Sequence, residues 1–289
     1  MRKGIEPEET FRVAPALNLG LPGTVFALVF LRRPSAVKNG SRNLSLPVEC
    51  FLKVLRTPRY TGQSLIGETM DAIECIKSRT SIRKFKSDPV PRKLLVEIIE
   101  AACQSPSYRN CQPWEVAVVS GRKKQALSDL LIDLAEKGVT PKPDIPAPAA
   151  WPKIIEERME DHFHKRARNL GIDLSDPNFM KHSLIENFRF YGAAHAMFLF
   201  QDSSLSSWQI LDMGIFAQSL MLAAHAMGLG TVPQAYVTNY AAEVKTFLNI
   251  PESKRLVLGL SLGYPDPDAP AGRTQGDRMD VGSVVRWIE

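Results

Sequence analysis

The segment Ser78–Phe85, which reads S-R-T-S-I-R-K-F, combines side chains that can bind an anion. Arg79 and Arg83 supply planar guanidinium groups whose forked N–H donors match the oxygens of a phosphate. Thr80 and Ser81, which lie between them, add hydroxyl donors. The segment therefore predicts a site for a phosphate ester, such as that of a nucleotide-like cofactor. The alternative is that two arginines at a helix end face water or complement the helix dipole.

The elements around this segment are predicted from apolar spacing. Residues 70–77 have helical periodicity, which would place both arginines at a helix end. A second amphipathic helix is expected from Pro91 to Ala102, and a strand from Trp114 to Val119. Between them lies the loop Ser105–Trp114, rich in short hydroxyl and amide side chains. Such a loop can direct several hydrogen-bonding groups at a planar polar ring.

Taken together, these two blocks resemble the amino-terminal half of the FMN-dependent nitroreductase family. The family pattern is R-x-S-x-R-x-F followed by A-P-S-x-x-N-x-Q-P-W, and this chain has S-R-T-S-I-R-K-F and then A-A-C-Q-S-P-S-Y-R-N-C-Q-P-W. Two later blocks are also similar to the family. They are W-x-x-x-D-x-G-x-x-x-Q-x-L-x-L-A-A, which begins at Trp208, and the terminal V-V-R-W-I-E.

The resemblance implies that FMN is the bound cofactor and that NADH or NADPH is the electron donor. It assigns the phosphate and ribityl chain to the start and end of the domain, and the ring to two later loops. Arg83 would tune the flavin near its N1 and C2 carbonyl edge, and no side chain would act as a nucleophile. The implied cofactor-binding residues are Arg79, Thr80, Ser81, Arg83, Pro106, Ser107, Asn110, Pro233, Gln234, Ala235 and Arg278.

Two details of this assignment are specific to the resemblance. Pro106, Ser107 and Asn110 are expected to come from the partner subunit of a domain-swapped homodimer. The family often has a second basic residue where this chain has Gly276. Whether Arg273 takes its place is left open.

The implied activity is two-electron reduction of a small electron-poor acceptor, such as a nitroaromatic or a quinone, by a ping-pong mechanism. Reductive dehalogenation and fragmentation of the flavin are alternatives within the same fold. A hypothesis of a different class is a non-catalytic binding protein that uses the flavin fold.

The implied fold is α+β, with a mainly antiparallel central sheet flanked by helices on both faces. The sequence itself predicts apolar strands at Ala193–Phe200 and Arg255–Gly263 and a short strand in Gly228–Tyr236 that ends in a proline turn. The helix Trp208–Met227 is apolar nearly all round, which indicates the centre of the domain or a subunit interface. A further helix is expected at Asn239–Leu248.

The middle of the chain has the weakest patterns. Helices are predicted at Arg122–Glu136 and Trp151–Leu170, separated by the Pro-rich segment Thr140–Pro152, which is too broken for regular structure. A turn is expected at Gly171–Pro177. The resemblance places a variable helical excursion here that covers the active site and governs substrate choice. Its candidate pocket residues are Phe163, His164, Phe190 and Tyr191, although an aromatic residue at helical spacing is more often part of the core.

The charge distribution separates the first 69 residues from the rest. Of the 36 Lys and Arg residues, ten fall in residues 1–69, against five of the 31 acidic residues, so that the remainder holds 26 of each. We interpret residues 1–69 as a weakly ordered basic extension, leave open whether it belongs to the native product, and expect the compact domain to cover residues 70–289. A balanced domain argues against nucleic-acid binding.

Other function classes are disfavoured by the remaining composition. The apolar run Val25–Leu31 is too short to span a bilayer, so no membrane association is expected. The four cysteines show no C-x-x-C spacing and the histidines are scattered, so neither a metal site nor a disulfide framework is indicated. We expect a cytoplasmic protein with reduced thiols.

Overall fold

The computed structural model describes residues 70–170, 173–269 and 276–289. The extension 1–69 and Arg273 lie outside the described residues. The described part contains a four-stranded sheet of order β1-β2-β4-β3, in which every neighbouring pair is antiparallel. Its strands are β1 (Glu115–Ser120), β2 (His195–Asp202), β3 (Gly230–Gln234) and β4 (Lys254–Gly263). The predicted antiparallel sheet is confirmed.

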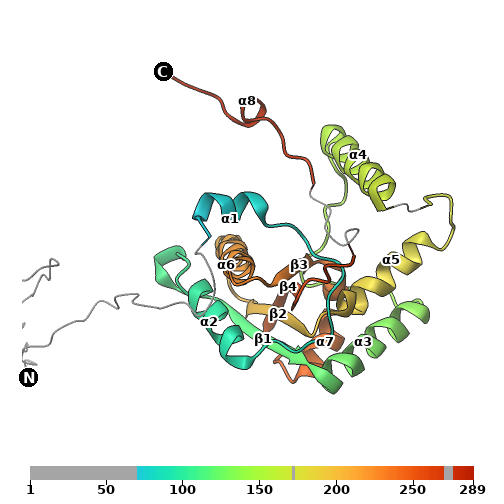
Figure 1. The fold of residues 1–289 in the computed structure, drawn as a ribbon. Coiled ribbons are helices and arrows are strands. Elements are labelled where there is room, and N and C mark those ends of the chain that lie inside the picture. The colour runs from blue at the N-terminus through green and yellow to red at the C-terminus, as the bar shows by residue number, and fades with distance from the viewer. Residues whose placement is uncertain (1–69, 171–172, 270–275) are drawn as a thin grey trace, which may run out of the picture. The chain divides into compact units, whose positions relative to one another are not determined.

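Helices surround this sheet, as Figure 1 shows. Most agree with the predicted helices to within two residues. Two were not predicted: α5, in the middle of the chain, and the short α8, in the tail. The described helices are α1 (Ala72–Ser78), α2 (Arg92–Ala102), α3 (Gly121–Glu136), α4 (Lys153–Leu170), α5 (Phe179–Phe188), α6 (Ser207–Ala226), α7 (Ala241–Leu248) and α8 (Val281–Val284).

Strand β2 lies inside the sheet and is buried on both faces, as its unbroken apolar run predicted. Successive side chains of a strand point to opposite faces. Met197 and Leu199 therefore pack with α2 and α6, while Phe198 and Phe200 pack with α3 and α7. The sheet thus separates two apolar cores, and each core is closed by its own helices (Figure 1).

Helix α6 begins with a capping box. The Ser206 hydroxyl accepts from the Trp208 amide, and the Gln209 side chain accepts from the Ser206 amide at 3.1 Å. Helix α6 buries Met213, Phe216 and other residues in the core. No helix in the described ranges is long and apolar enough to cross a bilayer.

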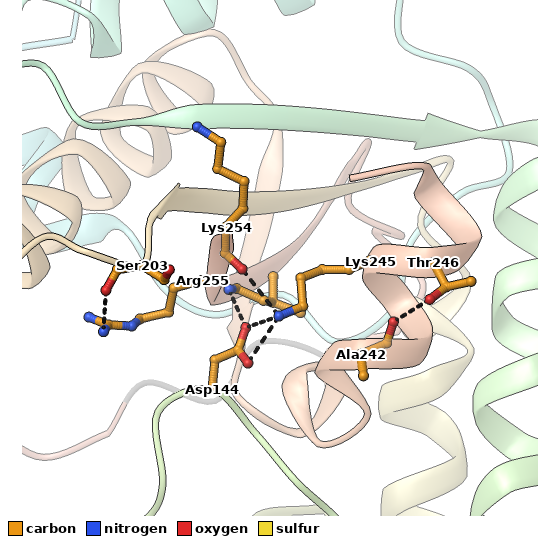
Figure 2. A network of polar contacts seen from close by, with 8 residues as sticks. Asp144, Ser203, Ala242, Lys245, Thr246, Lys254 and Arg255 are labelled. Carbon is orange, nitrogen blue, oxygen red and sulfur yellow. Dashed lines mark hydrogen bonds and ion pairs between the residues drawn. The ribbon is translucent and has the colours of Figure 1, made fainter. Parts of the chain in front are cut away.

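The Pro-rich segment 140–152 has no regular structure, as predicted, and one of its side chains anchors it to the sheet. Asp144 lies between Lys245 of α7 and the start of β4 (Figure 2). Its carboxylate accepts from Lys245 Nζ at 3.0 Å and from the Leu256 amide at 2.7 Å. Lys245 Nζ also donates to the Lys254 carbonyl at 3.1 Å. These contacts fix the segment that leads into α4.

Candidate functional site

The arginine-rich segment begins where α1 ends. Arg79 is the C-terminal cap of α1, and its amide donates to the Cys75 carbonyl at 3.1 Å. Beyond it the chain is extended: Ser81 forms a parallel bridge with Thr231 of β3, and the Ile82 amide donates to the Thr231 carbonyl at 3.0 Å. The predicted position of Arg83 at the helix end is therefore wrong, because pairing with β3 carries it beyond the helix.

The segment lies very close to β3. Ile82 is buried, and a Cβ atom added at Gly230 would lie 2.7 Å from its Cγ1 atom. Real Cβ atoms do not approach other atoms so closely, so glycine at this position permits the close approach. Ile82 thus anchors the segment and determines where the flanking arginines lie.

Both ends of the described domain contribute to one cavity of about 130 Å³. Arg278 reaches it from the carboxyl-terminal tail, and His162 reaches it from α4. One ion pair joins the tail to α4, because Lys165 Nζ lies 2.7 Å from Asp277. Within α4, Lys165 Nζ also lies 2.8 Å from Asp161. The lining residues are Arg79, Thr80, Ser81, Arg83, His162, Gly276 and Arg278.

The four arginines at this cavity have no anionic partner among the described residues; Arg79, Arg83 and Arg166 are half-buried, and Arg278 is exposed. Burial, and secondly the charge of Arg278, lower the pKa of Arg79. Burial, and secondly the charge of Arg83, lower the pKa of Arg166 on α4. Arg79 Nη1 and Arg166 Nε are buried and have no hydrogen-bond partner. None of the ion pairs among the described residues involves these four arginines. Because buried charges need partners, the arrangement suits an anionic ligand.

Tyr191 lies against this cluster in a strained backbone. Phe190 and Tyr191 both have positive φ, 55° and 53°. Burial raises the pKa of the Tyr191 hydroxyl, while Arg83, Arg166 and hydrogen bonds with Arg83 and Asn187 oppose the shift. Tyr191, a candidate pocket residue, therefore contacts the cluster. Phe190 instead lies in the core, 1% exposed, and packs edge-on against Phe198.

The loop Ser105–Trp114 lies away from this cavity, on α6. Its path is fixed by the Tyr108 amide, which donates to Asp212 at 3.1 Å, and by the Ser105 hydroxyl, which donates to Ser219 at 2.8 Å. Pro106 and Asn110 are exposed and Ser107 is half-buried. Within one chain, then, none of these three predicted residues lines the cavity.

Strand β3 carries the remaining predicted residues. Pro233 lies inside β3, not in a turn as predicted. Proline is tolerated there because β3 is an edge strand, so the backbone N–H that proline lacks is not required for pairing with another strand of the sheet. Pro233 and Ala235 are exposed, while Gln234 is buried. The Gln234 side chain bonds the Asn187 carbonyl at 2.8 Å and the Ser261 hydroxyl. Because these contacts occupy the Gln234 side chain, only the backbone of Gln234 remains available to bind a ligand.

Comparison with known proteins identifies the family. The sequence model of the nitroreductase family matches residues 76–264, more than half of the chain. The chain belongs to the nitroreductase family. Among its curated relatives, nitroreductase NfnB of Mycolicibacterium smegmatis is 34% identical over 76% of this chain and 96% of the relative. The 4-nitrobenzoate reductase of Pseudomonas putida is 35% identical over 71% of this chain and 89% of the relative.

Solved structures agree with the nitroreductase fold. The crystal structure of FMN-dependent NfnB from Mycobacterium smegmatis in complex with NADPH has a TM-score of 0.72 and 32% identity. It covers 75% of this chain and 98% of that chain. Oxidised iodotyrosine deiodinase bound to FMN and 3-iodo-L-tyrosine, at 21% identity and a TM-score of 0.53, shares the fold alone.

Two residues beside the cavity of this nitroreductase were missed by the sequence analysis. His162 and Arg166 are four residues apart, so they lie on one face of α4. That spacing was the available signal, but a helix as charged as α4 has several such pairs. What singles these two out is their position beside Arg83 and Gly276, which only the tertiary structure shows.

Proposed function

We propose that this nitroreductase is an FMN-dependent NAD(P)H oxidoreductase that reduces nitroaromatics, quinones or similar electron-poor acceptors. The observation that carries the proposal is a cluster of four arginines without carboxylate partners, two of which have a buried unpaired nitrogen, at a cavity lined from both ends of the domain. The relatives named as nitroreductases and 4-nitrobenzoate reductases support the activity, and the NfnB complex supports the cofactor and donor.

The cavity residues fit a flavin phosphate. Arg79 has a buried Nη1 that lacks a partner, and Arg278 is close enough to lower its pKa. A doubly charged phosphate would relieve this repulsion and supply oxygens for both guanidinium groups. Arg79, Thr80, Ser81 and Arg278 would therefore hold the phosphate and ribityl chain.

Arg83 would lie at the pyrimidine edge of the ring. When bound, FMN supplies a two-electron carrier that takes a hydride from NADH or NADPH and passes the electrons to the acceptor in a ping-pong cycle. Arg83, oriented by the Tyr191 hydroxyl, would stabilise negative charge that develops at this edge. The exposed loop residues Pro106, Ser107 and Asn110 would bind the ring of the partner subunit's cofactor. The backbone of Pro233, Gln234 and Ala235 would lie along the ring.

The proposed assembly is a homodimer. Trp208 and Leu211 of α6 are 59% and 55% exposed, and Ile73 and Ile76 of the adjacent α1 are 57% and 52% exposed. Helix α1 contacts the carboxyl-terminal end of α6, where the Cys75 thiol bonds the Leu222 carbonyl, whereas Trp208 and Leu211 lie at the other end of α6. Exposed apolar groups in this number are typical of a surface that a partner covers.

The proposal extends to location and domain limits. Cys75, Cys103 and Cys111 are free thiols, which supports a reducing, cytoplasmic compartment. Residues 1–69 are proposed to be dispensable for cofactor binding, because the family match begins at residue 76.

The test is to purify the full chain, record its absorption spectrum, and measure NADH and NADPH oxidation with nitrobenzene, a quinone and a halogenated phenol. We expect a yellow protein that turns over the nitroarene. A chain starting at Met70 should bind FMN equally well. A colourless chain that does not take up added FMN would contradict the proposal. A yellow chain without turnover would favour the binding-protein hypothesis, and loss of halide from the phenol would favour dehalogenation.

A further inference from the structure

Arg166 lies beside the cavity, and under the proposed binding of FMN no anionic group of the cofactor is assigned to it. It lies one turn along α4 from His162, which lines the cavity, and on the same helix face. Arg83 and Tyr191 are its charged or titratable neighbours. Its Nε is buried without a partner. Arg166 is therefore prepared for an anionic ligand.

The positive charge around the cavity exceeds what one phosphate monoester balances. The phosphate carries about two negative charges, whereas three guanidinium groups line the cavity and that of Arg166 lies beside Arg83; among the described residues no carboxylate lines the cavity. Under the proposed function Arg79 and Arg278 hold the phosphate, and Arg83 lies at the ring edge. Arg166 lies on α4, the helix that would cover the ring, and it remains available to the substrate that binds over the ring.

We propose that Arg166 binds the carboxylate of the electron acceptor, so that this enzyme prefers nitroaromatic acids to neutral nitroarenes. This inference rests on the proposed function and makes Arg166 a specificity-determining residue. A guanidinium fork matches both oxygens of a carboxylate, and partial burial strengthens the pair. A neutral acceptor would leave the buried Nε unpaired, which is how a polar site rejects a ligand that lacks the matching group.

The test compares two acceptors of nearly equal size, 4-nitrobenzoate and the neutral 4-nitrobenzamide, with the full-length FMN-loaded enzyme. Arg166→Gln should lower kcat/KM for 4-nitrobenzoate by about 10- to 100-fold, chiefly through KM, as expected for loss of a charge-assisted hydrogen bond. For 4-nitrobenzamide the change should stay below about threefold. Arg166→Lys should recover part of the preference. Arg168→Gln, an exposed arginine on the same helix, is the matched control.

A second measurement does not depend on turnover. Benzoate should bind the oxidised enzyme and perturb its flavin absorption, and Arg166→Gln should weaken this binding by about 10- to 100-fold while the FMN content is unchanged. Equal losses for both acceptors, or loss of FMN, would overturn the inference. So would a defect confined to NADPH relative to NADH, which would assign Arg166 to the donor's phosphate. If the wild type binds benzoate through Arg166 but reduces no acceptor, the proposed function fails and the anion site stands.

Discussion

At the scale of single residues, Arg79 is the side chain on which the proposed phosphate site depends most. Its Nη1 is buried and unpartnered, so substitution removes donors that no neighbour replaces. Arg79→Gln should weaken FMN binding by about 10- to 100-fold, because hydrogen bonds to charged groups contribute about 1.5–3 kcal/mol. Titration of the apoprotein by flavin fluorescence measures this. Arg122→Gln, an exposed arginine at the start of α3, should bind like the wild type; equal weakening in both would remove the phosphate assignment.

His195 gives the folded chain a pH dependence. It is buried at the start of β2, and its Nε2 accepts from the Val90 amide at 3.0 Å. Burial lowers its pKa below the usual 6.5; the hydrogen bond with Val90 opposes this shift, and the charge of Lys124 adds to it. On acidification below that value the unfolded chain takes up the proton first, so the free energy of unfolding decreases as pH falls from about 7 to 5.

His195→Gln should therefore reduce the loss of stability between these two pH values. The measurement is the urea midpoint of each protein at both pH values. His164→Gln, on the exposed surface of α4, should retain the wild-type loss. An unchanged loss in His195→Gln would show that other groups cause the acid sensitivity.

The sequence predicted the site residues unequally. Arg79 and Arg83 could be predicted because both belong to one short continuous motif, S-R-T-S-I-R-K-F. Arg278 came only from resemblance, since nothing local marks a tail arginine as part of a distant cavity. Arg166 could not be predicted, because its proximity to Arg83 depends on how α4 returns to the start of the domain.

At the scale of elements, Asp144 connects an irregular segment to α7 and β4. Lys245 is 8% exposed, so removing the carboxylate would leave a buried ammonium group without its counter-ion. Asp144→Asn should lower the free energy of unfolding by about 3 kcal/mol. Urea denaturation followed by circular dichroism measures the change.

The control for this ion pair is Asp133→Asn, because the Asp133–Lys137 pair is exposed on α3. Its loss should cost no more than about 0.5 kcal/mol. The double variant Asp144→Asn/Lys245→Met, which removes both charges, should recover at least half of the lost stability. A double variant as unstable as Asp144→Asn alone would contradict the explanation by an unpaired charge.

Regular elements were predictable where apolar residues kept one period or formed a continuous run. Strand β2 is the clearest case, because a continuous apolar run requires burial on both faces. Helix α5 was missed because its apolar residues do not share a face: Met180 is 60% exposed, whereas Phe188 is fully buried. The sheet order could not be derived either, because β4 enters between β2 and β3.

At the scale of the whole molecule, the proposed homodimer makes a measurable prediction. Light scattering should give twice the 32.2 kDa of one chain. Leu211→Glu would place a charge in the proposed contact of α6 and should yield a monomer that loses most of its FMN, because the partner's loop would no longer reach the ring. Met180→Glu, an equally exposed apolar position on α5, should remain a dimer. A monomeric wild type that keeps FMN would contradict both the dimer and the shared site.

The close approach of Ile82 to Gly230 has a consequence for directed evolution of this enzyme. Any side chain at Gly230 would push Ile82 outward and displace the two flanking arginines together. In a library randomised at position 230 and screened for the yellow colour of bound FMN, the coloured clones should retain glycine. Glycine is expected there although it has no side chain that could contact the cofactor. Libraries designed to change the electron acceptor should therefore keep Gly230 and vary residues of α4 instead.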